Sequence, residues 1–241
     1  MKKKNRFWIS PLIIIMGLLF LAGFCQKEDD DDTPGEITDK DGNVYTSVTI
    51  GTQVWMVGNL KTTKYNDGTD IPLVNIDELW TDLAYNDTEG YCWYENNAAN
   101  KADYGALYNW YAVKTGKLCP TGWHVPSHDE WTTLTNYLGG EDVAGAKLKE
   151  TGNSHWVSPF NVDATNETGF SARPGGYRNL YGLFYWIGDR GIWWTSTETG
   201  VAYNDVWYWC MYAGSSSLVG FDYSGNYSVS SSGCAVRCVK D

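Results

Sequence analysis

Basic residues are scarce in this sequence: 18 Lys and Arg stand against 29 Asp and Glu, which gives a net charge of -11 at pH 7. Proteins that bind a phosphate backbone carry clustered Lys and Arg, which displace the counterions of the nucleic acid. The shortage therefore excludes nucleic acid as the expected ligand. Aromatic residues, in contrast, make up 15% of the chain and hydrophobic residues 43%. This composition can form a sizeable core, so we expect one folded domain rather than a disordered chain or a long coiled coil.

Motifs of the common enzyme classes are also missing. The sequence has no HExxH, no GxSxG, no Walker loop and no GxGxxG after a strand. Only three histidines are present. Pro126 lies between His124 and His128 and precludes an ordinary helical pair of metal ligands, so we expect these two and His155 to have capping and core polar roles. No metal and no cofactor are predicted.

Acidic pairs are common in the chain and therefore carry little information. Asp129 with Glu130, or Asp163 with Glu167, could provide acid and base catalysis on a glycoside. Acidic residues are so frequent here that such pairs arise without any catalytic role. No spacing suggests a histidine partner for a nucleophilic cysteine. We therefore predict that the protein is not an enzyme.

No hydrophobic run in the leader reaches the ~20 residues that a membrane-spanning helix needs. The uninterrupted run from Leu12 to Phe24 has 13 residues. A basic start at residues 2–6 precedes this run, and Cys25 follows it directly. This is the layout of a bacterial export signal. Small residues ahead of a cysteine resemble a lipoprotein signal. We predict a signal peptide at residues 1–24 and lipidation of Cys25; the alternative is a membrane-spanning anchor.

Five adjacent acidic residues, from Glu28 to Asp32, follow Cys25. Like charges at this density repel one another and do not pack, so residues 25–36 are expected to form a solvated tether. The segment also resembles the acidic tag that sends Bacteroidetes lipoproteins to the outer face of the outer membrane. The predicted location is the cell surface, with the protein attached to the outer membrane through its lipid.

Short β-prone runs dominate the chain from Ile37 onward. Val44–Ile50 and Gln53–Val57 are typical of two strands joined at Gly51. After Gly152 the pattern predicts only strands and loops. Few helices and many short strands indicate an α+β domain with extensive ordered loops.

The clearest helix is predicted over Ser127–Leu138. Ser127 and Glu130 have the spacing of a capping box, and Gly139 follows the end of the helix. Tyr104–Val113 and Glu141–Glu150 show weaker helical patterns. Trp123, Trp131 and Trp193 are expected to be core rings.

Five cysteines follow the leader, and export makes disulfides possible. Cys234 and Cys238 form a CxxxC pair without the further ligands that a zinc site needs. An odd number leaves at least one thiol free or paired outside the chain. We expect Cys119 and Cys238 to form a bridge that ties the loop ahead of the main helix to the C-terminal strand, although sequence does not fix the connectivity.

Numerous collinear motifs resemble one family, the Fibrobacter succinogenes major paralogous domain, over residues 37–241. The resemblance implies a C-type-lectin-like fold, related to that of formylglycine-generating enzymes, in exported or surface-attached proteins. Several such proteins are similar to targets of diversity-generating retroelements, which randomise template adenines at the 3′ end of a gene. The motifs are Asp39–Tyr45, Gln53–Met56, Asn59–Tyr65, Gly90–Tyr94, Tyr104–Trp110, Cys119–Pro126, Glu130–Trp131, Gly169–Ala172, Pro174–Tyr177, Trp193–Glu198 and Val236–Asp241.

The composition of residues 199–236 fits such diversification. Randomised AAC or AAT codons cannot encode Lys, Glu, Gln, Met or Trp, but readily encode Tyr, Ser, Gly, Asp, Asn, Val, Ala, Phe and Cys. The segment has no Lys, Arg, Glu, Gln, His or Pro, and its acidic residues are Asp205 and Asp222. Trp207, Trp209 and Met211 would then belong to a fixed scaffold. The alternative is an ordinary lectin loop rich in Tyr, Ser and Gly.

The same segment has the amino-acid mix of a recognition surface. Tyr and Trp provide rigid contact area, whereas Ser, Gly and Asn adapt their hydrogen bonds. We expect the strands around Trp193–Trp194 and Val236–Val239 to hold this face rigidly. The predicted partner is a protein or carbohydrate on another cell, a phage or a host. The predicted ligand-binding residues are Tyr203, Asn204, Asp205, Trp207, Tyr208, Trp209, Tyr212, Phe221, Asp222, Tyr223, Asn226 and Tyr227.

Two other functions remain open from the sequence. The first is an oxidase like the formylglycine-generating enzyme, for which Cys234 and Cys238 are the only close cysteine pair. The second is a module that binds plant polysaccharide by stacking exposed tryptophans on sugar rings. Binding of the ligand, whether a protein or a carbohydrate, is expected to be independent of calcium.

Overall fold

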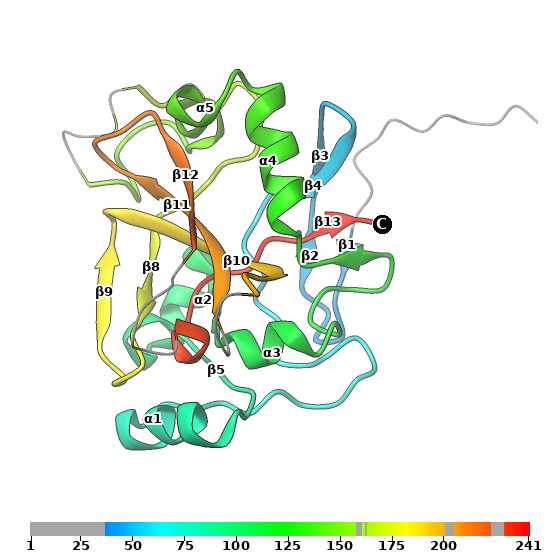
Figure 1. Cartoon of the computed structure of the whole chain (residues 1–241), viewed down its shortest axis with the longest axis vertical. Coiled ribbons are helices and arrows are strands. Elements are labelled where there is room, and N and C mark those ends of the chain that lie inside the picture. The colour runs from blue at the N-terminus through cyan, green and yellow to red at the C-terminus, as the bar shows by residue number, and fades with distance from the viewer. Residues whose placement is uncertain (1–36, 158–160, 162, 201–204, 223–228) are drawn as a thin grey trace, which may run out of the picture. The chain divides into compact units, whose positions relative to one another are not determined.

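The computed structural model of the chain describes residues 37–157, 161, 163–200, 205–222 and 229–241 (Figure 1). All described residues belong to one compact unit, residues 34–241. The predicted signal peptide, Cys25 and the acidic tether lie outside the described residues. Among the described helices, none has the length and hydrophobicity to cross a membrane.

Five α-helices and many short strands make up the described part of the chain, which confirms the α+β class. The helices are α1 (Asp77–Asn86), α2 (Lys101–Tyr104), α3 (Trp110–Lys114), α4 (His128–Tyr137) and α5 (Glu141–Leu148). Three 3-10 turns are η1 (Tyr94–Asn96), η2 (Ala98–Asn100) and η3 (Val229–Ser231). The strands are β1 (Ile37–Thr38), β2 (Val44–Tyr45), β3 (Ser47–Ile50), β4 (Gln53–Met56), β5 (Tyr91–Cys92), β6 (Leu107–Tyr108), β7 (Trp123–His124), β8 (Gly175–Arg178), β9 (Phe184–Ile187), β10 (Arg190–Glu198), β11 (Val206–Tyr212), β12 (Leu218–Asp222) and β13 (Val239–Lys240).

Two larger sheets organise these strands. One has three strands in the order β10-β11-β12, and the other has four in the order β3-β4-β13-β7. β1-β2, β5-β6 and β8-β9 are two-stranded. All the paired strands run antiparallel. The longest strand, β10, lies beside β11 across the middle of the unit, with β9 along one edge (Figure 1).

The predicted helix over Ser127–Leu138 is confirmed as α4. Ser127 is its N-cap, and its hydroxyl accepts a hydrogen bond from the backbone N–H of Glu130 at 3.2 Å. The Glu130 carboxylate accepts from the backbone N–H of Ser127 at 2.7 Å, which completes the capping box. Trp131 and Leu134 are buried on the inner face of this helix. The weaker pattern at Glu141–Glu150 corresponds to α5, which ends at Leu148.

The prediction of a helix over Tyr104–Val113 is wrong. Gly105 adopts a positive φ of 76°, and a Cβ there would lie 2.7 Å from the carbonyl oxygen of Leu60. This close approach breaks the helical path, and the chain forms β6 before a new helix starts. Asn109 caps that helix, α3, by accepting a hydrogen bond from the N–H of Ala112 at 3.1 Å. The expected strand Val44–Ile50 also divides into β2 and β3, while the turn at Gly51 is confirmed.

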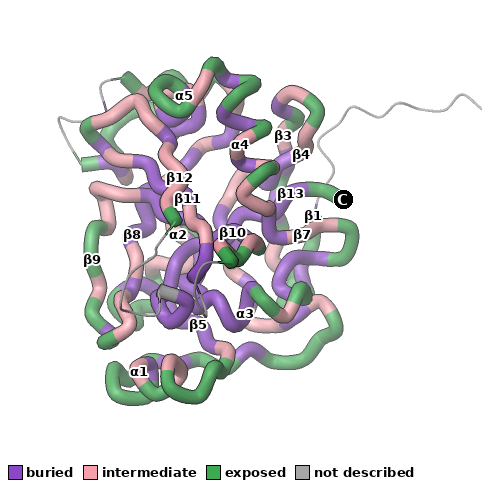
Figure 2. Tube along the Cα trace, viewed as in Figure 1, coloured by how far each residue is buried: buried purple, intermediate pink, exposed green. Residues whose placement is uncertain are grey.

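The β10-β11-β12 sheet separates two large hydrophobic clusters. Consecutive strand residues point to opposite faces, so Trp194 and Cys210 belong to the first core cluster and Trp193 and Trp209 to the second. Trp131 and Trp193 are fully buried, as predicted. The expectation for Trp123 is wrong, because its ring is only partly buried and packs against the edge of the first cluster. Buried residues gather around β10, β11 and α3, whereas β9 and α1 are largely exposed (Figure 2).

A disulfide joins the loop before β7 to the residue before β13. Cys119 and Cys238, the pair expected to form a bridge, are bonded in the structure with a Cα–Cα distance of 6.0 Å. The bond links positions 119 residues apart in the sequence. It therefore holds the C-terminal strand in the four-stranded sheet from a distant part of the chain.

Candidate functional site

The residues predicted to bind a ligand fall into two groups. Seven lie in the described part, on or beside β11 and β12: Asp205, Trp207, Tyr208, Trp209, Tyr212, Phe221 and Asp222. Five lie outside the described residues: Tyr203, Asn204, Tyr223, Asn226 and Tyr227. The candidate site is therefore built on two paired strands and not only on loops.

Two of the seven residues are poorly placed to contact a ligand. Trp209 is fully buried and stacks on Trp131 with a centroid distance of 6.1 Å and an interplanar angle of 22°. Its place in β11 points it toward α4 and the second core cluster. Asp205 has only 4% of its surface exposed. Assigning these two side chains to the binding surface is wrong, since neither is accessible.

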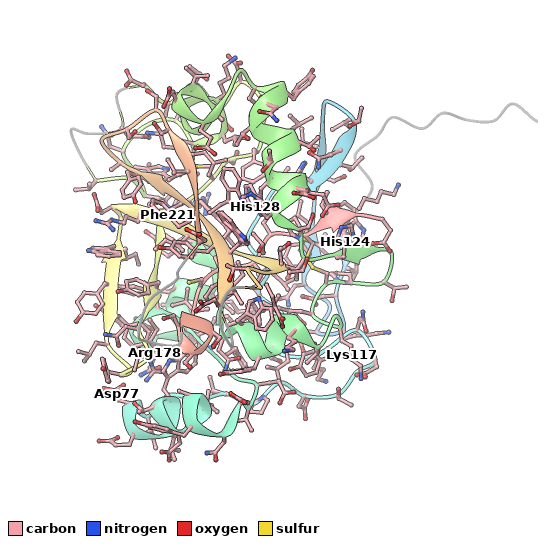
Figure 3. The ribbon with its side chains drawn as sticks, in the orientation of Figure 1. Asp77, Lys117, His124, His128, Arg178 and Phe221 are labelled. Carbon is pink, nitrogen blue, oxygen red and sulfur yellow. A yellow bond between two sulfur atoms is a disulfide. The ribbon has the colours of Figure 1, made fainter. Side chains whose placement is uncertain are left out.

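Trp207 shares the α4 side of β11 but reaches the surface. Its ring lies on His128 with a centroid distance of 3.9 Å, and it is directly opposite Asp222 in the register of β11 and β12. His128 also stacks on Trp209 at 5.5 Å, so this histidine joins a half-exposed ring to a buried one. Figure 3 labels His128 on α4 and Phe221 on β12.

The opposite face of β11 carries Tyr208 and Tyr212. The Tyr208 ring stacks on Phe221 of β12 with a centroid distance of 5.4 Å and an interplanar angle of 20°. All three rings are half-buried and pack on the first core cluster. Burial raises the pKa of Tyr212 to about 12, and a hydrogen bond with the Cys210 side chain adds to the shift, so this hydroxyl is protonated at neutral pH.

Neighbouring aromatic residues that were not predicted extend this face. The Arg190 guanidinium lies 3.4 Å from the ring centroid of Trp186 and 4.9 Å from that of Tyr212, so it connects β9 to β11. Trp186 also stacks on Tyr177 at 4.9 Å. We call this set the aromatic surface: Tyr177, Tyr185, Trp186, Arg190, Tyr208, Tyr212 and Phe221.

Trp186 is the most unusual member of the aromatic surface. It is 40% exposed, and its φ of 66° is in the left-handed region that bulky residues avoid. Backbone strain of this kind persists only where the surroundings impose it, and it gathers at functional sites. The run Phe184-Tyr185-Trp186 was the available sequence signal, but composition does not show which rings are exposed.

The three histidines do not form a metal site. Among the described residues, no group of three or more His, Cys, Asp or Glu is arranged to hold a metal ion. His124 lies between Asp241 at 2.7 Å and Glu130 at 2.8 Å. Burial opposes its protonation, but these hydrogen bonds outweigh the effect and raise its pKa. His124, which is labelled in Figure 3, therefore links Asp241 to Glu130 in the first turn of α4.

The close cysteine pair considered for an oxidase is not a pair of free thiols. Cys238 is bonded to Cys119, while Cys234 is a buried free thiol. Burial raises the pKa of Cys234 well above its ordinary value, and raises the pKa of Cys92 and Cys210 to about 12. Thiols with such values are poor nucleophiles. The described cysteines are therefore structural.

Comparison with known proteins identifies one family. A sequence model of the Fibrobacter succinogenes major domain matches residues 48–240. No curated protein and no solved structure matches the chain. This family is not known as a family of enzymes. Membership in it indicates a protein of the cell surface.

Proposed function

We propose that this chain, which belongs to the Fibrobacter succinogenes major domain family, binds a protein or glycan on another cell, a phage or a host. Binding is non-covalent and takes place at the aromatic surface, whereas Trp207 and Asp222 lie on the opposite face of β11 and β12. The observation that carries the proposal is the chain of ring contacts from Trp186 through Arg190 to Tyr212, on strands anchored in the core. No catalytic step is part of this function.

The chemistry of the aromatic surface favours recognition. Trp, Tyr and Arg are the residues that most often dominate binding energy at interfaces. The members on β10, β11 and β12 project from paired strands whose other faces pack in the second core cluster, so little side-chain and loop freedom is lost on binding. Tyrosine hydroxyls add hydrogen bonds to the contact area of the rings. Such a surface suits either a protein epitope or a sugar ring.

Side chains along β11 alternate between two faces, and the residue types on each face also support diversification of the aromatic surface. Trp207, Trp209 and Met211 cannot arise from randomised AAC or AAT codons, and all three point toward α4 and the second core cluster. Tyr208 and Tyr212 can arise from such codons, and both lie on the other face, in the aromatic surface. A retroelement could therefore change the ligand contacts while the packing residues stay constant. A C-type-lectin-like fold would provide the scaffold.

The binding surface is tested by removing rings without disturbing the core. Trp186→Asn is the sharpest variant because asparagine tolerates a positive φ, so the backbone of β9 is retained. We expect its melting temperature to stay close to that of the wild type, while affinity falls by about 30-fold, equivalent to roughly 2 kcal/mol for a hot spot. The full chain is first screened on a glycan array and a panel of bacterial and host cells. The best binder is then titrated.

Tyr85→Asn provides the matched control, since Tyr85 is 82% exposed on α1 and lies outside the aromatic surface. This variant should bind as the wild type does. Tyr212→Ser should weaken binding like Trp186→Asn. Unchanged affinity in both Trp186→Asn and Tyr212→Ser would disprove a role for the aromatic surface.

We further propose that the chain is a lipoprotein, attached through Cys25 to the outer face of the outer membrane. Cys25→Ala should abolish incorporation of radiolabelled fatty acid and either release the protein or stall its processing. Substituting the five acidic residues 28–32 with alanine should keep the lipid but remove surface exposure. Protease added to intact cells measures that exposure. A lipidated wild-type protein that intact cells protect from protease would contradict the surface location.

A further inference from the structure

A polar cavity of about 350 Å³ lies away from the aromatic surface. None of its lining residues belongs to that surface. It forms where the segment after β4 meets α2, the segment before β8 and the residues before β13. The polar side chains that matter for its chemistry are Asn59, Lys61, Asp103, Glu150, Arg173 and Arg237.

Arg237 is buried in the wall of this cavity, and among the described residues no carboxylate forms an ion pair with it. Its side chain donates to the carbonyl oxygen of Phe170 and, at 3.0 Å, to the Asn59 side-chain oxygen. Both partners are neutral, and the buried Nε atom has no hydrogen-bond partner. Burial lowers the pKa of Arg237 to about 9, which reflects the cost of keeping the charge there. A buried cation without a carboxylate partner is unfavourable, and the Phe170 ring, whose centroid lies 4.1 Å from the guanidinium carbon, compensates part of this cost.

Other described arginines have carboxylate partners. Arg173 lies 2.9 Å from Glu150 and 3.2 Å from Asp103, while Arg178 pairs with Asp77 and Arg190 with Asp189. The two carboxylates of the cavity are thus already engaged by Arg173, and His155 contacts both of them as well. They are therefore not available to neutralise Arg237.

The lining of the cavity has an excess of one positive charge in a strongly acidic protein. Lys61, Arg173 and Arg237 contribute three cations, against the carboxylates of Asp103 and Glu150. An anion with one negative charge would balance the cavity. A doubly charged phosphate would leave an excess of negative charge beside those two carboxylates. The planar guanidinium group also matches the geometry of a carboxylate.

We propose that this cavity binds a small organic acid through its carboxylate, with Arg237 as the charge partner and Lys61 at the rim. The volume is at the lower end of the range for small-molecule sites and suits a ligand the size of a monosaccharide acid. The polar lining provides hydrogen-bond partners for hydroxyl groups. This site is separate from the proposed recognition surface and can fail or succeed independently of it.

The test is isothermal titration of the full chain with sodium D-glucuronate, and with D-glucose as a neutral counterpart. We expect saturable binding of glucuronate that weakens with added salt, and no binding of glucose. Arg237→Gln keeps donors for Phe170 and Asn59 but removes the charge, so affinity should fall at least tenfold. Lys61→Gln should lower the affinity about threefold. Because Lys61 is partly exposed, this variant still tests the site if the Arg237 variant misfolds.

Lys117→Gln is the matched control because it removes one positive charge outside the cavity lining (Figure 3). It should bind glucuronate with unchanged affinity. The proposal is overturned if glucose binds as tightly as glucuronate, or if glucuronate does not bind saturably. It is also overturned if sodium phosphate binds more tightly than glucuronate, or if neither Arg237→Gln nor Lys61→Gln weakens binding.

Discussion

Replacing Trp193 with alanine is expected to lower the free energy of unfolding by about 3–5 kcal/mol. Trp193 is fully buried in β10, opposite Trp209 of β11, and packs against Trp131 with a centroid distance of 6.1 Å. Its indole N–H donates to the Asn59 side chain at 2.9 Å. The variant would leave a large cavity in the second core cluster and remove one of the two hydrogen bonds that the Asn59 oxygen accepts. Urea denaturation measures the loss.

Trp207→Ala is the control for this substitution, since Trp207 lies on the same side of the sheet but only half-buried. We expect a loss of about 1 kcal/mol, from the stacking on His128. Equal losses for Trp193 and Trp207 would contradict the assignment of one to the core and the other to the surface.

Loss of the Cys119–Cys238 disulfide is expected to destabilise the domain by about 4–5 kcal/mol. The bond joins residues 119 positions apart, and in the chain-entropy account a loop of about this length restricts the unfolded chain by that amount. Cys119→Ala combined with Cys238→Ala should therefore lower the midpoint of urea unfolding strongly. Reductant should bring the wild-type protein to the same midpoint.

Cys92→Ala separates this effect from the loss of a buried sulfur. Cys92 is a free, fully buried thiol in a different core cluster, and its replacement should cost about 1 kcal/mol and leave the response to reductant intact. A double variant within 1 kcal/mol of the wild type, with no response to reductant, would show that the bond does not support the fold.

Local signals were sufficient where neighbouring residues make the contacts. α4 was predictable because Ser127 and Glu130 satisfy each other's backbone groups within one turn. The β3–β4 hairpin was predictable because Gly51 provides the positive φ of its turn. Both features depend on residues only a few positions apart, so the amino-acid pattern contains the necessary information.

Local sequence patterns did not predict the structure where contacts between distant residues determine it. α1 has no side-chain N-cap hydrogen bond; Arg178, about 100 positions away, pairs with Asp77 at 2.6 Å and lies over the Trp80 ring. Tyr104–Val113 has helical spacing, but the close approach of Gly105 to Leu60 replaces one helix with a strand and a shorter helix. Neither contact is visible from neighbouring residues.

The sequence by itself determined the α+β class, the family, and one segment, residues 199–236, that is rich in aromatic residues. Only the tertiary structure decided which rings of that segment are accessible. Trp207 and Trp209 are two residues apart and have the same side chain, yet one reaches the surface and the other is buried against Trp131. The reason is that an aromatic ring stabilises a core or a binding surface through the same contact area. Both rings lie on the α4 side of β11: Trp209 packs against Trp131, whereas Trp207 lies on His128 at the start of α4. The position of each ring along α4, a helix from another part of the chain, decides between them.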